Sequence, residues 1–233
     1  MPLIFDPLYF LFAIPPLLLS MWASWQTKRA FKKYSRVGNA NRLTGAQAAK
    51  VLLDRAGIHD VSIVETQGFL SDHYHPGKKQ LALSPDVYRQ PSISAIGVAC
   101  HEAGHAIQHA TNYAPLGVRS ALVPTVGIGS NLGIWIATFG IFFSAEPMIL
   151  IGALLFSAVV LFQLITLPVE FDASNRAKKL AFEHGLVVND SERQGMAKVL
   201  NAAAMTYVAA AVSSILTLLY FLMRAGVLGG RND

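Results

Sequence analysis

Long apolar runs divide the chain, and polar segments separate them. Four runs, at residues 7–25, 122–143, 148–167 and 202–223, consist mainly of apolar or small side chains. A helix needs about 20 such residues to cross the roughly 30 Å hydrocarbon core of a bilayer. The pattern therefore predicts a mainly α-helical membrane protein with about four transmembrane helices.

The polar segment between the first two runs carries the signals of a small α/β unit. Thr44 is suited to cap a helix that Gly57 ends. Alternating apolar and polar residues mark two short strands, with a turn-rich stretch between them and a last helix after them. In chain order, we expect a helix over 45–55, a strand over 61–64, turns over 70–77, a strand over 80–84 and a helix over 92–112.

Composition and charge agree with a membrane location. Hydrophobic residues make up 53% of the chain and charged residues 14%, whereas soluble domains carry about 25% charged residues. Of the 19 Lys and Arg residues, 12 lie within residues 28–119 and five within 176–198. The positive-inside rule then places both polar segments in the cytoplasm and the N-terminus outside, so the net charge of +5 indicates topology rather than nucleic-acid binding. We expect no cleavable signal peptide, because Met1–Asp6 lacks a basic region.

The last helix of the polar segment contains the sequence His101-Glu102-Ala103-Gly104-His105. Residues four apart lie on one face of a helix, so His101 and His105 can direct two imidazoles at one metal ion. Glu102 is rotated by about 100° from His101, which suits a general base acting on a water rather than a third ligand. Zinc with such a base predicts peptide-bond hydrolysis. The alternative is a helix that carries these three residues by chance.

A catalytic zinc normally has three protein ligands and one open position. Glu170 follows the third apolar run, on the same side of the membrane as the motif, and is the candidate for the third ligand. Asp172 is the rival candidate. Pro168 is expected to open a new helical direction there. The alternative for Glu170 is a glutamate favoured at a helix start by the helix dipole.

Four other residues near the motif are weaker candidates for metal ligands. His73 and His75 are two apart in the turn-rich stretch, which favours a solvated turn. His109 lies one turn beyond His105, too far for a zinc shared by all three, and is expected to be a supporting or surface residue. Cys100 is the only cysteine and is expected in the core. The strand over 80–84 comes just before the motif helix and is expected to be an edge strand along which a substrate lies.

Three motifs in order carry a family resemblance: HEAGHAIQH, LSDHYHPGKK and LPVEFDASNRA. With the apolar helices around them, they resemble the YugP-like neutral zinc metallopeptidases of bacterial membranes, over nearly the whole chain. That family is similar, more distantly, to HtpX and the prenyl-protein endopeptidase, gluzincins whose third ligand is a glutamate that begins an E-x-x-x-D helix. The resemblance implies Zn²⁺ as cofactor, His101, His105 and Glu170 as its ligands, and Glu102 as the base. Ser174 stands where the distant relatives have an aspartate.

The expected fold is thus a mainly α membrane protein with about four transmembrane helices and a small cytoplasmic α/β zincin-like metallopeptidase unit. The segments, in order, are a first transmembrane helix (1–25), a cytoplasmic segment with short strands and the motif helix (26–120), a transmembrane hairpin (121–168), a cytoplasmic helical segment with the third ligand (169–201), and a fourth transmembrane helix with a tail (202–233).

The expected function is a multi-pass bacterial membrane zinc endopeptidase with a cytoplasmic active site. Its partners would be the lipid bilayer and a peptide or protein substrate, membrane proteins among them, but no nucleic acid. One alternative is a site-2-type intramembrane protease, which needs its motif within a spanning helix, whereas Ser92 and Ser94 precede this motif and His109 and Thr111 follow it. The other alternative is a non-enzymatic membrane scaffold or chaperone with structural zinc or none. Structural zinc usually takes four protein ligands, commonly including cysteine.

Overall fold

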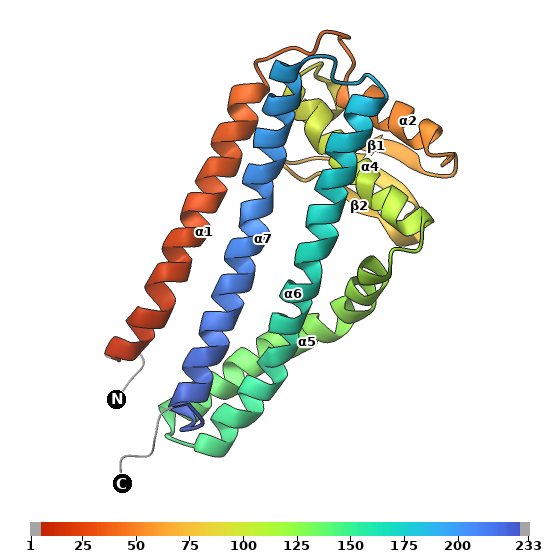
Figure 1. Cartoon of the computed structure of the whole chain (residues 1–233). Helices are drawn as coiled ribbons and strands as arrows, with labels where there is room; N and C mark the ends of the chain where they lie inside the picture. The colour runs from red at the N-terminus through yellow and green to blue at the C-terminus, as the bar shows by residue number, and fades with distance from the viewer. Residues whose placement is uncertain (1–5, 229–233) are drawn as a thin grey trace. The chain divides into compact units, whose positions relative to one another are not determined.

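The computed structural model describes residues 6–228, except for the side chains at positions 125, 128 and 129. The described chain is mostly helical (Figure 1). It divides into two compact units. The first unit comprises the described parts of residues 1–23, 118–168 and 206–233. The second unit comprises residues 24–117 and 169–205 and contains the strands and both candidate ligand segments.

Long helices form the first unit and continue beyond it. They are α1 (Pro7–Tyr34), α5 (Ala114–Phe142), α6 (Glu146–Glu183) and α7 (Asp190–Arg224). Among the described residues, α1, α6 and α7 are long and apolar enough to cross a membrane, whereas α5 contributes a shorter apolar stretch, Ser130–Phe142. Three of the predicted spans thus lie in such helices. The second predicted span is helical, and the count of four stays a prediction.

Small residues let α5 and α6 approach each other closely within the first unit. A Cβ atom at Gly152 would lie 2.4 Å from the backbone nitrogen of Ala137, and one at Gly140 would lie 2.7 Å from that of Ile149. Larger side chains at these positions would push the two helices apart. Close backbone packing of this kind is the usual way in which helices associate in lipid, where the hydrophobic effect does not drive them together.

The second unit begins with α2 (Gly45–Arg55), which has the bounds that the sequence predicted. Thr44 caps it: its side chain accepts a hydrogen bond from the Gln47 backbone, and the Gln47 side chain accepts one from the backbone N–H of Thr44. This reciprocal capping box satisfies two N–H groups that a helix start leaves without a helical partner. Gly57, just after the helix, has a φ of +70°, a conformation that glycine adopts without a steric penalty.

The sheet has three strands, in the order β1-β3-β2. β1 (Ser62–Glu65) is parallel to β3 (Gln80–Leu83), and β2 (His73–His75) is antiparallel to it. Two sequence expectations were wrong here. The stretch over 70–77 contains β2 and a short 3₁₀ helix (Pro76–Lys78) rather than turns alone, and β3 is the central strand, paired on both sides, rather than an edge.

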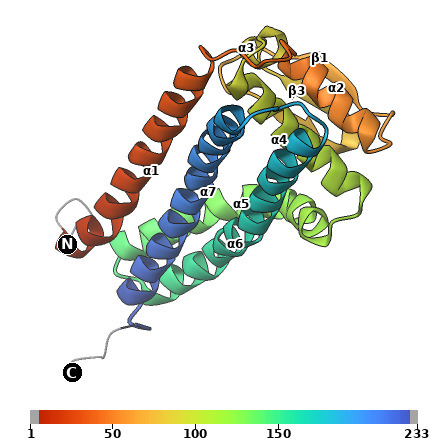
Figure 2. The ribbon, with the colours of Figure 1, turned by 45° about the horizontal axis from the view of Figure 1, so that its top comes forward.

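The helices α3 (Pro85–Arg89) and α4 (Ile93–Ala110) follow the sheet, and α4 packs against α2, α3, β2 and β3 (Figure 2). The core between them is apolar and includes Leu52, Leu53, Leu81 and Ile96, each at most 1% exposed. This packing holds the motif helix on a rigid support, which a site of defined geometry needs.

The polar segment after the third apolar run differs from expectation. Pro168 does not start a new helix, because α6 continues through it to Glu183. The break comes later, between α6 and α7, where Gly185 has a φ of +68°. A proline in a long helix costs one backbone hydrogen bond, which helices at a membrane tolerate when neighbouring groups compensate.

Candidate metal centre

The motif lies in the middle of α4, a helix that is fixed at its start. Ser92 precedes the first turn, and its side chain accepts a hydrogen bond from the Ala95 backbone N–H at 3.2 Å. Two to three turns later, the rings of His101 and His105 lie edge to face, with their centroids 4.8 Å apart and an interplanar angle of 81°. The two imidazoles therefore lie on one face of α4, as their spacing predicted.

Glu170 of α6 completes the group. Its Oε2 lies 3.2 Å from Nε2 of His101 and 3.5 Å from Nε2 of His105. The ligand atoms of the three residues all lie within 4.8 Å of one another. The Glu170 side chain is only 2% exposed, and a carboxylate buried to that degree is costly unless cationic or hydrogen-bonding groups face it.

Neighbouring charged groups shift the pKa values of Glu170 and His105. Burial by itself would raise the pKa of Glu170, but the facing imidazoles of His101 and His105 outweigh burial and hold that pKa well below its usual value of 4.5. Burial by itself would lower the pKa of His105, but the carboxylates of Glu170 and Glu102 outweigh it and raise that pKa above 6.5. The two carboxylates thus favour a positive charge beside them, whether a proton on His105 or a bound cation.

The donor set suits zinc. Two imidazole nitrogens and one carboxylate oxygen are the ligands of many catalytic zinc sites. Two atoms bound to one zinc at about 2.0–2.2 Å and at a tetrahedral angle lie roughly 3.3–3.5 Å apart. The separations of 3.2 and 3.5 Å between the Glu170 oxygen and the two imidazole nitrogens agree with that value.

Residues outside the group contact the Nδ1 atoms of the two imidazoles. The Ser174 hydroxyl lies 3.1 Å from Nδ1 of His101, and Oε1 of Gln108 lies 2.9 Å from Nδ1 of His105. Both contacts leave the Nε2 atoms facing Glu170. Ser174 thus contacts a ligand histidine from the position at which the distant relatives have an aspartate.

Asp172, the rival ligand, lies outside the group. Its Oδ2 accepts a hydrogen bond from Nε of Arg176 at 2.6 Å and another from the Gln108 amide at 2.8 Å. Residue 172 is two positions from Glu170 on α6, about 200° around the helix, so the two carboxylates face different directions. This geometry favours Glu170 over Asp172 as the ligand.

Comparisons with known proteins agree with the geometry. Residues 9–226 match the model of a family described as "Putative neutral zinc metallopeptidase". The chain belongs to this zinc metallopeptidase family. It is 44% identical over 226 residues to a Bacillus subtilis (strain 168) protein named "Putative membrane protease YugP", a match that covers 97% of this chain and 99% of that protein. No solved structure matches the chain.

Among the described residues of this family member, His101, His105 and Glu170 form the one group of three or more possible metal-binding side chains. His109 instead contacts the Tyr74 hydroxyl through Nδ1 at 2.8 Å, so it supports the packing of α4 on β2. His73 and His75 are exposed on β2. The strand alternates, so these two side chains point away from the face that carries Tyr74.

Cys100, next to the motif in this family member, is fully buried. Burial raises the pKa of its thiol to about 12. A buried, protonated thiol is neither a ready nucleophile nor an accessible ligand. The sequence prediction that Cys100 belongs to the core is confirmed.

One acidic residue near the site, Asp72 of the LSDHYHPGKK motif, was not predicted from the sequence. Asp72 precedes β2 and accepts hydrogen bonds from the backbone N–H and the hydroxyl of Ser84 at 2.7 and 3.0 Å. Burial raises the pKa of Asp72, and the negative charge of Glu102 raises it further. Asp72 therefore shares the electrostatic environment of the motif. Only the folding of the strands brings it there.

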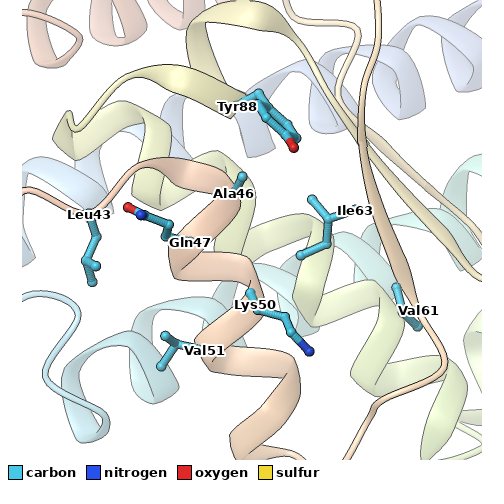
Figure 3. A pocket seen from close by; sticks show the side chains of 8 residues that line it. All are labelled: Leu43, Ala46, Gln47, Lys50, Val51, Val61, Ile63 and Tyr88. Atoms are coloured by element: carbon cyan, nitrogen blue, oxygen red, sulfur yellow. The ribbon is translucent and has the colours of Figure 1, made fainter.

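A pocket of about 580 Å³ lies elsewhere in the second unit, between α2 and β1 (Figure 3). The side chains of Val51 and Ile63 are among those that line it, with Tyr88 near one end. No member of the candidate metal group takes part in it.

Proposed function

We propose that the chain is a membrane-anchored zinc endopeptidase with its active site at the cytoplasmic surface of the membrane. The observation that carries the proposal is the convergence of His101, His105 and Glu170 from two helices, with Glu102 beside them. The family and the similar membrane protease support the same chemistry.

The protein's own residues would divide the work as follows. His101, His105 and Glu170 hold the metal. Zinc, when bound, lowers the pKa of a coordinated water to about 7 and polarises a substrate carbonyl. Glu102, which is 8% exposed, accepts a proton from the attacking water and delivers it to the leaving amine.

The His101–Glu170 contact also bears on topology. The two residues face each other, so the chain between them must begin and end on the same side of the membrane. The apolar parts of α5 and α6 would then cross the bilayer as a pair, which supports the four-span prediction. The basic residues on these polar segments favour the cytoplasm as that side.

Each alternative function requires one feature that the described residues do not provide. A site-2-type intramembrane protease needs its motif in a spanning helix, but α4 is not among the three candidate spans of the described chain. A structural zinc site usually closes with four protein ligands, but the group contains three, and the single cysteine is buried beside it rather than within it. The proposed substrates are therefore peptides or proteins that reach the membrane surface, including membrane proteins.

The test is Glu102→Gln. We expect the purified protein in detergent to keep its zinc and to lose cleavage of casein or a model peptide by several orders of magnitude, because the ligands survive while the base does not. Glu183→Gln, which changes an exposed carboxylate away from the site, is the matched control and should cleave normally. Undiminished cleavage by Glu102→Gln would remove Glu102 from the mechanism.

A further inference from the structure

Gln108 is a fully buried polar residue one turn beyond His105 on α4. Its amide makes three short hydrogen bonds. Oε1 lies 2.9 Å from Nδ1 of His105, and Nε2 donates hydrogen bonds at 2.8 Å to the backbone oxygen of Val169 and at 2.8 Å to Oδ2 of Asp172. The amide thus connects a proposed ligand on α4 with the segment of α6 that carries Glu170.

These contacts determine which way the amide faces. A backbone carbonyl can only accept a hydrogen bond. The same holds for the ionised carboxylate of Asp172, which pairs with Arg176 at 2.6 Å. The NH₂ group of Gln108 must therefore face Val169 and Asp172. If the amide turned over, its oxygen would face two acceptors, and both hydrogen bonds would be lost in a buried place.

The orientation of the amide in turn determines the tautomer of the histidine. With Oε1 facing the ring, Nδ1 of His105 must carry a hydrogen and donate it. A neutral ring then has its lone pair on Nε2. That lone pair faces Oε2 of Glu170 at 3.5 Å, so two acceptors point at one space, an arrangement that a cation between them stabilises.

We propose that Gln108 is a positioning residue that fixes His105 in the Nδ1–H tautomer, with Nε2 ready for the metal, and that it does so by linking the ring to Val169 and to the Asp172–Arg176 pair of α6. The inference rests on the proposed metal site. It adds that the carboxylate of Asp172 acts on the site through Gln108 rather than as a ligand.

His101 provides the contrast. Its Nδ1 contacts the Ser174 hydroxyl, which can either donate or accept a hydrogen bond. The hydroxyl therefore holds the ring in place without selecting a tautomer. Selection of one tautomer is therefore specific to His105.

The first experiment measures the tautomer in the wild-type protein and uses a variant only for assignment. Metal-free wild-type protein with ¹⁵N-labelled histidine is studied by NMR in detergent, at a pH at which the rings are neutral. The resonances of His105 are assigned by their loss in His105→Ala. We expect a protonated Nδ1 and an unprotonated Nε2 for His105, whereas a free imidazole prefers the opposite tautomer. A His105 ring protonated on Nε2 alone would overturn the proposal.

The second experiment measures zinc affinity by competition with a chelator. Gln108→Met keeps the side chain's length but removes its acceptor and donors, and we expect zinc to bind about 10- to 100-fold more weakly, as for other groups that orient a metal ligand. Ser94→Ala is the control, since Ser94 is a fully buried residue of the same helix whose hydroxyl bonds to Ser92. Its zinc affinity should be unchanged.

A rescue separates positioning from mere packing. In Gln108→Glu/Asp172→Asn the amide and the carboxylate exchange places, so residue 108 still accepts from His105 and residue 172 can donate to it, while the hydrogen bond to Val169 is lost. We expect this double variant to regain much of the zinc affinity lost in Gln108→Met. Unchanged zinc affinity in folded Gln108→Met, with only a lower melting temperature, would show a packing role and overturn the proposal. If Gln108→Met kept its zinc affinity while Glu102→Gln abolished activity, the proposed function would stand and the positioning role of Gln108 would fall.

Discussion

A Cβ atom on Gly104 would lie 2.7 Å from the backbone oxygen of Ala173. Gly104 lies between the two histidines of the motif, and Ala173 lies between Glu170 and Ser174 on α6. The absence of a side chain at Gly104 therefore sets the distance between the helix that carries the histidines and the helix that carries the third proposed ligand. Backbone approach of this kind leaves no room for even one methyl group.

The first prediction follows from that contact. Gly104→Ala should displace α6 from α4, weaken zinc binding by at least tenfold and destabilise the protein by about 1–3 kcal/mol, the usual cost of overpacking. Zinc titration and thermal unfolding measure the two effects. Gly117→Ala, a helical glycine of α5 with open space around its Cβ position, should leave both unchanged or slightly improved. Equal zinc affinity in Gly104→Ala would mean that the approach of the helices does not control the site.

The second prediction separates the two acidic candidates on α6. Glu170→Ala should greatly lower zinc affinity and abolish turnover, because it removes a direct metal bond. Asp172→Ala should retain more of the metal, with a loss of about 10- to 100-fold, because Asp172 acts through Gln108. Titration of zinc into each metal-free variant makes the comparison. Full retention by Glu170→Ala together with loss by Asp172→Ala would transfer the ligand role to Asp172.

The third prediction concerns pH. The pKa of His105 is raised above 6.5 in the metal-free protein, so its proton stabilises the fold fully below pH 6.5 and this contribution is lost as pH rises through the folded-state pKa. The pKa of Glu170 is lowered, so its contribution is present above pH 4.5 and is lost only as pH falls through its lower folded-state value. Zinc must displace the proton on Nε2 of His105. Its affinity should therefore start to fall at a pH above 6.5 as the solution is acidified.

Melting temperatures of metal-free and zinc-loaded protein from pH 5 to 9 test this. The difference between the two should widen as pH rises, until His105 has lost its proton. Glu102→Gln is the control, because the charge of Glu102 helps to raise the pKa of His105. In that variant the pH dependence should move to lower pH. A difference in melting temperature that is constant across the range would contradict the prediction.

The fourth prediction concerns topology. With the N-terminus outside and four spans, a cysteine at Lys78, placed between β2 and β3, should be protected from membrane-impermeant reagents in intact cells and should react after lysis. Cys100→Ala is the background for this labelling. Cys100 itself should stay unlabelled in folded protein, since it is fully buried and the pKa of its thiol is about 12. Labelling of position 78 in intact cells would place the site outside and overturn the topology.

The sequence by itself determined the features that depend on neighbours within a few residues. The capping box at Thr44 and Gln47 fixed the start of α2, because both hydrogen bonds close within four residues. The spacing of His101 and His105 fixed their common face, because a helix repeats every 3.6 residues. The apolar runs gave the positions of the long helices, although the number that cross the membrane stays a prediction.

Only the tertiary structure decided the features that depend on distant partners. β2 lies in a stretch rich in turn residues and exists because it pairs with β3, and β3 becomes central only when β1 pairs with its other side. Pro168 predicted a new helix, but α6 continues through it to Glu183, which helices at a membrane tolerate when neighbouring groups compensate for the lost hydrogen bond. Glu170 and Ser174 contact the motif through helix packing, where Gly104 allows close approach, and Gln108 of the motif helix reaches Val169 in the same way. Contacts between residues more than 60 positions apart leave no local pattern in the sequence, because burial and hydrogen bonding select them only after the helices have met.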